Sequence, residues 1–296
     1  MSGTRISIVQ VALAAALWGP WSLFLRWSQL PALTCAALFM TLLAVGGIPA
    51  TWQNRKRDRP RSAWLWMLLF GVFDAGNTGF FFLAVLNGPV AVATLSHYLA
   101  PVLTPLVALM LLSERPSRRT YPAAALGLIG VGLLLWPAQG VGAVPSSHIA
   151  LTAAFGAASA VFYATMVPFG KKLGQYFSPF EVQGIHSWLS AALLWAVAPH
   201  EAIPLAAASK VLAGGVVCGW VGGALFYRGV KHVPAGLSSV LTYLEPLVAT
   251  VIGGLVFHEQ LGPLAAVGAA LVLGGGIYLV AETVGASPPS EPVRAE

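Results

Sequence analysis

Apolar runs of about twenty residues recur along the chain, separated by short polar loops rich in proline and glycine. A helix rises about 1.5 Å per residue, so roughly 20 apolar residues cross the hydrocarbon core of a bilayer. The runs do not alternate apolar and polar positions, which argues against strands. They predict ten membrane-spanning helices over residues 6–26, 30–51, 62–86, 90–112, 118–137, 147–170, 178–199, 209–229, 235–257 and 261–282.

One stretch of the chain occurs twice. Residues 88–114 read GPVAVATLSHYLAPVLTPLVALMLLSE, and residues 233–259 read VPAGLSSVLTYLEPLVATVIGGLVFHE. Tyr98 and Pro101 match Tyr243 and Pro246 at one offset of 145 residues (246 − 101). A repeat at so large a fixed offset predicts two five-helix repeats, residues 1–140 and 141–284. Because five is odd, we expect the second repeat to be inverted, with a site near the membrane midplane between the two.

Composition agrees with an all-α integral membrane protein. Of 296 residues, 57% are hydrophobic and 9% are charged, with a mean hydropathy of +0.77, whereas a soluble domain carries about 25% charged residues. The net charge of +6 does not indicate nucleic acid, because the basic residues cluster in short loops between the apolar runs. If the N-terminus is cytoplasmic, 14 of the 16 Lys and Arg residues fall on the inside. We therefore expect both termini, and a disordered tail at 285–296, to be cytoplasmic.

Several motifs together resemble a known family. ALAAALWG near the start, a Phe-rich third span, and YLxP followed thirteen residues later by Glu are similar to the EamA family of the drug/metabolite transporter superfamily. The resemblance covers about residues 6–282. It implies a ten-helix carrier of the bacterial inner membrane, built from two inverted repeats. Within the family the chain looks most like the YddG-type exporters, which implies export of aromatic amino acids. Many relatives carry an Arg in the second span, where this chain has Ala36, Ala37, Leu38 and Phe39.

Two carboxylates lie at the centres of predicted spans, Asp74 in the third and Glu245 in the ninth. A charged Asp at the bilayer centre costs roughly 2.5 kcal/mol or more, so each should face the protein interior. Each is interpreted as a ligand for a substrate ammonium or as a proton-coupling group. The alternative is a structural carboxylate, hydrogen-bonded to neighbouring helices. Asn77 shares a helical face with Asp74, and His97 belongs to a polar stripe of the fourth span, which fits either role.

Prolines and aromatic residues complete the set of candidates. Pro101, Pro105 and Pro246 interrupt the fourth and ninth spans near the middle and are interpreted as hinges, the alternative being packing kinks. Deep aromatic residues could form a cage for a substrate, or simply pack. The candidates for substrate binding or coupling are Trp18, Trp21, Asp74, Asn77, His97, Tyr98, Tyr163, Trp188, Trp220, Thr242, Tyr243 and Glu245. Small-residue runs at 127–132 and 268–276 predict close packing of the fifth and tenth spans, within the scaffold or at a dimer contact.

These features favour a secondary transporter that exports small metabolites, foremost amino acids including aromatic ones, by alternating access. One alternative is a proton-coupled antiporter of cationic drugs or other metabolites; another is a membrane scaffold without transport. HExxH, GxSxG and Cys/His clusters are all missing from the sequence, so we expect neither an enzyme nor a metal site, and no cofactor. The expected partners are a small-molecule substrate and the lipid bilayer, not nucleic acid, in a monomer or weak dimer.

Overall fold

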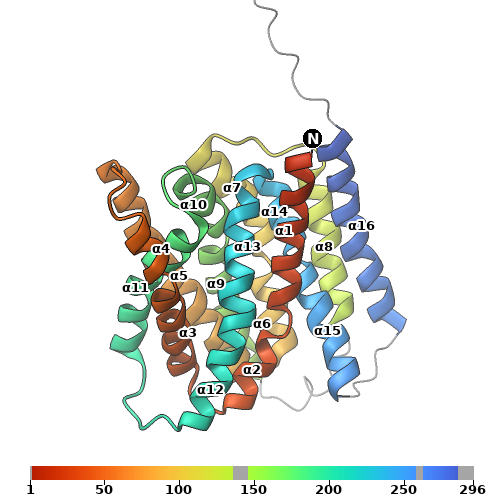
Figure 1. The fold of residues 1–296 in the computed structure, drawn as a ribbon. Helices are drawn as coiled ribbons and strands as arrows, with labels where there is room; N and C mark the ends of the chain where they lie inside the picture. Colours follow the sequence, from red (N-terminus) through yellow and green to blue (C-terminus); the bar gives the residue numbers. More distant parts are fainter. Residues whose placement is uncertain (1, 136–145, 258–262, 286–296) are drawn as a thin grey trace, which may run out of the picture.

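The computed structural model describes residues 2–135, 146–257 and 263–285, and within these ranges every regular element is a helix. Most of the helices run roughly side by side in one bundle (Figure 1). The first part of the chain forms α1 (Ser2–Trp18), α2 (Trp21–Ser28), α3 (Ala32–Gly46), α4 (Ile48–Gln53), α5 (Arg61–Asn87), α6 (Val90–His97), α7 (Ala100–Leu112) and α8 (Thr120–Leu134).

The second part begins with α9 (Ser146–Tyr163), α10 (Met166–Leu173) and α11 (Pro179–Val197). It continues through α12 (Leu205–Gly214), a π-helical segment (Gly215–Val221), α13 (Gly222–Gly229) and a 3₁₀ turn (Val230–His232). It ends with α14 (Ala235–Leu241), α15 (Leu244–Phe257) and α16 (Pro263–Gly285). Helix α1 begins and α16 ends at the same end of the bundle (Figure 1).

The ten predicted spans correspond to helical segments, but not all of these meet the same standard. In the described ranges, eight are long and apolar enough to cross a bilayer. The fifth, α8, has only 15 residues. The seventh, α11, has 19 residues but is more polar, because Glu181, Gln183 and His186 lie within it. Gly285, predicted as the first residue of the tail, is instead the last residue of α16. Residues 286–296 lie outside the described residues, as do His258 and Glu259, the last two residues of the second repeat copy.

The fourth and ninth spans are broken at the same place in both copies. Helix α6 ends before Tyr98 and Leu99, and α7 follows; α14 ends before Thr242 and Tyr243, and α15 follows. The prolines come two or three residues later, where their missing N–H groups fall in the first turn of the new helix and cost little. The predicted interruptions are therefore present, whereas their role as hinges stays a prediction. Pro105 lies inside α7.

A second pair of helix breaks is separated by the same 145 residues (164 − 19), and the sequence analysis did not predict it. The first span turns at Gly19 and Pro20 between α1 and α2, and the sixth turns at Ala164 and Thr165 between α9 and α10. These two turns are 145 residues apart (164 − 19), as are the other two breaks. The eighth span is disturbed differently, by the π-helical segment at its centre, a feature often found at functional sites.

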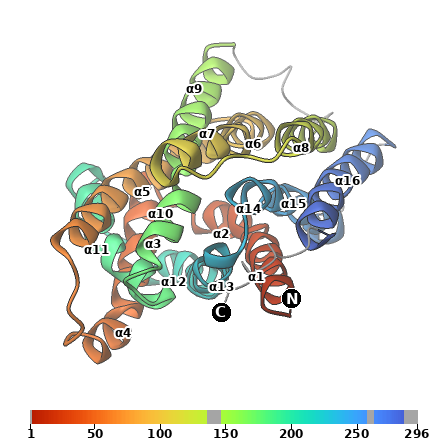
Figure 2. The ribbon, with the colours of Figure 1, turned by 90° about the horizontal axis from the view of Figure 1, so that it is seen from above.

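The fifth and tenth spans pack against each other at one edge of the bundle, as α8 and α16 (Figure 2). A Cβ added at Gly268 would lie 2.5 Å from the carbonyl oxygen of Gly130, so these two backbones touch. The predicted close contact between small residues is confirmed, and it lies within the chain. The outer surface is apolar, as lipid requires: Met110 and Leu205 are each 82% exposed.

Candidate functional site

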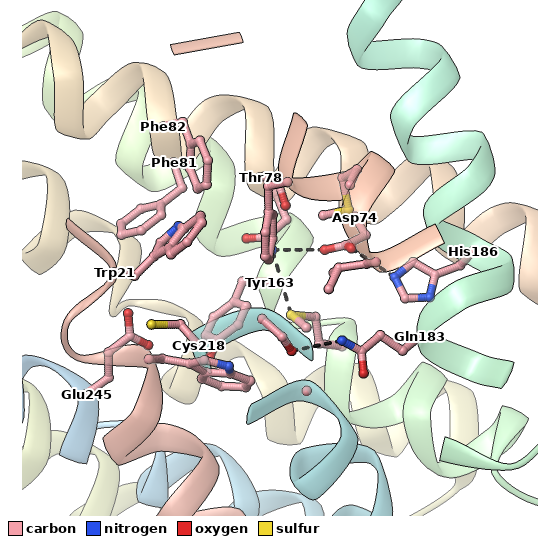
Figure 3. Close-up of a pocket in the computed structure, with 18 of the residues that line it drawn as sticks. Trp21, Asp74, Thr78, Phe81, Phe82, Tyr163, Gln183, His186, Cys218 and Glu245 are labelled. Atoms are coloured by element: carbon pink, nitrogen blue, oxygen red, sulfur yellow. Dashed lines mark hydrogen bonds and ion pairs between the residues drawn. The ribbon is translucent and has the colours of Figure 1, made fainter. Parts of the chain in front are cut away.

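A cavity of about 110 Å³ lies at the centre of the bundle, next to the helix breaks (Figure 3). Space of this size holds several water molecules or part of a small ligand. Helices α1, α2, α3, α5 and α6 line it from the first repeat, and α9, α10, α11, the π-helical segment, α13 and α15 line it from the second. Seven of the twelve predicted residues line it: Trp18, Trp21, Asp74, Asn77, His97, Tyr163 and Glu245.

Asp74 is held by two side chains from different helices. Its Oδ2 lies 2.9 Å from Nε2 of His186 on α11, and its Oδ1 accepts a hydrogen bond of 3.1 Å from Nδ2 of Asn77. The ring of His186 stacks on Phe70, with centroids 4.2 Å apart, and only 1% of the histidine is exposed. Both oxygens of Asp74 are thus hydrogen-bonded within the protein. This is what we expected if Asp74 is a structural carboxylate. Asp74 nevertheless faces the cavity (Figure 3).

The hydrogen bonds of His186 determine the charge of this pair. Nδ1 contacts the carbonyl oxygen of Val182, which can only accept, so Nδ1 must carry a proton. One further proton lies between Nε2 and the Asp74 carboxyl group, whichever of the two holds it. The pair is therefore either imidazolium with carboxylate or imidazole with carboxylic acid, and both states have a net charge of zero.

His97 is neutral by the same reasoning. The hydroxyl of Ser159 donates to the carbonyl oxygen of Gly156 at 2.7 Å, so it must accept from Nδ1 of His97, also at 2.7 Å. The ring lies between Phe81 and Tyr163, with centroids 4.3 and 4.5 Å away. Nε2 has no acceptor among the described residues, and a buried imidazolium would need one. Nε2 of His97 is therefore a hydrogen-bond acceptor.

Glu245 is the cavity carboxylate without a counter-ion. It lies in the first turn of α15, directly after the helix break, and is half-buried. The hydroxyl of Tyr98 lies beside it, but makes no hydrogen bond of ordinary geometry with any described residue. Among the described residues the carboxyl group of Glu245 has no ion-pair partner, and the hydroxyl of Tyr98 is the donor beside it. Its carboxyl group points into the cavity on the side of Cys218 (Figure 3).

The other five predicted residues do not line the cavity. Tyr98 is fully buried beside Glu245, and Tyr243 donates to backbone carbonyls of Tyr98 and Ala124. Thr242 donates to the carbonyl oxygen of Ser239 at 2.7 Å. Trp220 packs on Phe180, with centroids 5.3 Å apart, and Trp188 is 50% exposed on the outer surface. Trp220 is therefore a packing residue in this structure, and Trp188 is a surface residue.

Gln183, His186 and Tyr227 line the cavity but were not among the predicted residues. Gln183 donates from Nε2 to the carbonyl oxygen of Gly219, in the π-helical segment, at 2.8 Å. A signal was present in the sequence: Gln183, His186, Ser187 and Ser190 fall at helical spacings on one face of an otherwise apolar span.

Comparison with known proteins places the chain in a family. A family model described as the EamA-like transporter family matches residues 5–136 and again residues 150–281. The chain therefore belongs to the EamA-like transporter family, and it contains the family's unit twice. This confirms the family resemblance seen in the sequence motifs, and with the apolar helices it identifies a multi-pass membrane transporter.

Similar proteins extend over almost the whole chain. One from Archaeoglobus fulgidus, named an uncharacterized transporter, is 30% identical over 277 residues and is matched over 92% of this chain and 95% of its own length. The uncharacterized transporter YojE of Bacillus subtilis is 23% identical, over 86% of this chain and 87% of its own. A crystal structure with 24% identity superposes with a TM-score of 0.73 over 93% of this chain and 97% of the other. These names give no substrate, so the aromatic amino-acid subtype stays a prediction.

Proposed function

We propose that this protein is a secondary transporter that exports small amine-bearing metabolites, with amino acids, including aromatic ones, as the first candidates. One observation carries the proposal: a central cavity is lined from both repeats, at four helix breaks that follow one 145-residue offset (246 − 101; 164 − 19). In a membrane, irregular backbone is tolerated where it lines a cavity or is buried in protein. Broken helices meeting at a midplane site are the usual architecture of secondary transporters.

The proposed mechanism is alternating access between two inverted five-helix repeats. The halves would rock about the cavity, with the breaks before Pro101 and Pro246 as hinges. We place the protein in the bacterial inner membrane with both termini in the cytoplasm. The common position of the start of α1 and the end of α16 supports this orientation, as does the basic loop before α5, which lies at the same end (Figure 1).

Aromatic side chains support an amphipathic ligand. Trp18 and Trp21 flank the break at Gly19 and Pro20, and Tyr163 precedes the break at Ala164 and Thr165. Phe39 and Phe82 pack with Trp21 at centroid distances of 4.7 and 5.6 Å. Such walls bind apolar or aromatic groups by burial and stacking, and bind ammonium groups through their faces. Aromatic amino acids and related amines have both features.

A proton-coupled antiporter of cationic compounds is the second candidate, and the unpaired carboxyl group of Glu245 favours it. A lone carboxylate in a largely apolar cavity needs a cation or a proton as its partner. The Asp74–His186 pair provides a second position that holds a proton.

Counterflow in proteoliposomes tests the proposal. Vesicles loaded with unlabelled phenylalanine would take up labelled phenylalanine from outside at equal pH if the protein is a facilitative carrier. Uptake that requires an imposed pH gradient would support the antiporter. Absence of flux for all amino acids and amines tested, from protein shown to be folded, would overturn the proposed function.

A further inference from the structure

We infer that the cavity selects ligands with one net positive charge, namely an arylalkyl ammonium group without a carboxylate, over zwitterionic amino acids. The inference rests on the proposed function, and within its amine-bearing ligands it ranks monocationic amines above the amino acids.

The first support is the charge of the described lining residues. Besides the uncharged phenols of Tyr163 and Tyr227 and the thiol of Cys218, they include four groups that can carry a charge near neutral pH: Asp74, His97, His186 and Glu245. Asp74 and His186 sum to zero, and His97 is neutral, because of the hydrogen bonds described above. Among these lining residues there is neither Lys nor Arg, so an ionised Glu245 leaves one negative charge without compensation. A ligand with a single positive charge neutralises the site, whereas a zwitterion leaves it charged in a medium of low polarity.

The second support is a pair of buried amide oxygens at the cavity that lack donors. Nδ2 of Asn77 is used by Asp74, and Nε2 of Gln183 is used by the carbonyl oxygen of Gly219. These contacts fix which amide atom is nitrogen and which is oxygen. Oδ1 of Asn77 and Oε1 of Gln183 are then left as buried acceptors with no donor in the described residues, on side chains that are only 8% and 2% exposed.

An ammonium group matches these vacancies, because it has three N–H donors and no acceptor. A carboxylate does not match them, because it has only acceptors and would face Glu245 and two amide oxygens with no cation to bind. The indole and phenol groups of Trp18, Trp21 and Tyr163 can donate a hydrogen bond but carry no charge. Their rings instead favour an ammonium group and an aromatic body.

The test compares ligands that share a ring and an amine but differ in charge. Wild-type protein in proteoliposomes, at equal pH on both sides, would be loaded with phenethylamine and supplied with labelled phenethylamine outside. Phenethylamine, phenylalaninamide, phenylalanine and 3-phenylpropionate would compete for counterflow. We expect the two monocations to compete at concentrations at least ~10-fold lower than phenylalanine, and 3-phenylpropionate not to compete.

Substitution of the carboxylate should reverse this order. Glu245→Gln removes the charge and nearly preserves the shape, so both monocations should lose at least ~10-fold, while phenylalanine should lose less or gain. Glu245→Asp, which keeps the charge, should retain the wild-type order and guards against a folding defect in the Gln variant. Glu282→Gln is the matched control, because Glu282 pairs with Arg119 and Ser117 outside the cavity and its loss should leave the order unchanged.

The outcomes separate this inference from the function on which it rests. Phenylalanine that exchanges as well as or better than phenylalaninamide would overturn the charge selection and leave the transporter standing. The same holds if Glu245→Gln lowers competition by phenylalanine and the amines equally. If all ligands fail to exchange in folded wild-type protein, the proposed transport function itself fails.

Discussion

The Asp74–His186 contact predicts that one substitution should repair the damage caused by another. His186→Leu fills a similar volume but removes the group that shares a proton with Asp74. The side chains are 5% and 1% exposed, so water cannot take the place of the imidazole. Breaking a buried pair by removing one partner costs about 3–5 kcal/mol, because the remaining charge is uncompensated.

Asp74→Asn should be much milder. The new amide oxygen still accepts from Asn77, and the new amide N–H₂ donates to Nε2 of a neutral His186, so the variant should lose about 1 kcal/mol. In the double variant, the amide N–H₂ loses its imidazole acceptor, which costs about 1–3 kcal/mol. The double variant should therefore be more stable than His186→Leu alone by about 1–3 kcal/mol, the reverse of additive damage.

The assay is unfolding in mixed micelles with increasing SDS, followed by tryptophan fluorescence, for wild type, both single variants and the double variant. The chain has 10 tryptophans, which give an adequate signal. A double variant that is less stable than wild type by the sum of the two single effects, and therefore less stable than His186→Leu, would refute the assignment of Asp74 and His186 as a pair that shares its charge.

Three further predictions concern other parts of the chain. Gly268→Ala places a Cβ 2.5 Å from a backbone oxygen and should lower the free energy of unfolding by about 1–3 kcal/mol. Gly276→Ala in the same helix meets nothing within 4 Å and should raise the free energy of unfolding by up to about 1 kcal/mol. Equal thermal stability of the two variants would contradict the close contact. Glu181→Gln removes the carboxylate that pairs with the guanidinium of Arg59, 2.6 Å away and 5% exposed. The free energy of unfolding should fall by about 3–5 kcal/mol, which lowers the Tm; an unchanged Tm would show that the pair is dispensable. Tyr243→Phe removes a donor to two backbone carbonyls and should cost about 1 kcal/mol with unaltered substrate competition; weaker competition would place this ring at the ligand after all.

The arrangement of spans was accessible from sequence because lipid imposes simple rules. Long apolar runs indicated the helices, and the prolines at 101 and 246 indicated where two of them break. The cost of a charge in lipid directed attention to Asp74 and Glu245, both of which line the cavity. These inferences needed only local composition and position along the chain.

The orientation of side chains around each helix was not accessible in the same way. The lipid-facing side of a membrane helix is apolar, and a cavity wall made of aromatic rings is apolar too, so the pattern does not tell a cavity-facing ring from a lipid-facing one. Trp21 and Trp188 were therefore equal candidates, yet one lines the cavity and the other is half exposed outside. The partner of Asp74 lies 112 residues away, and only the tertiary structure brings it within hydrogen-bonding distance.

The two repeats share their frame but not their charges. At the 145-residue offset (246 − 101), Asp74 corresponds to Gly219, His186 to Thr41 and Glu245 to Ala100. Asp74 comes from one repeat and His186 from the other, and neither repeat contains a copy of both. A homodimer assembled from either half alone would reproduce the breaks but lack this pair, and one of the two would also lack Glu245. Divergence after duplication has thus made the halves mutually dependent, and separating them into two genes would require that both be kept.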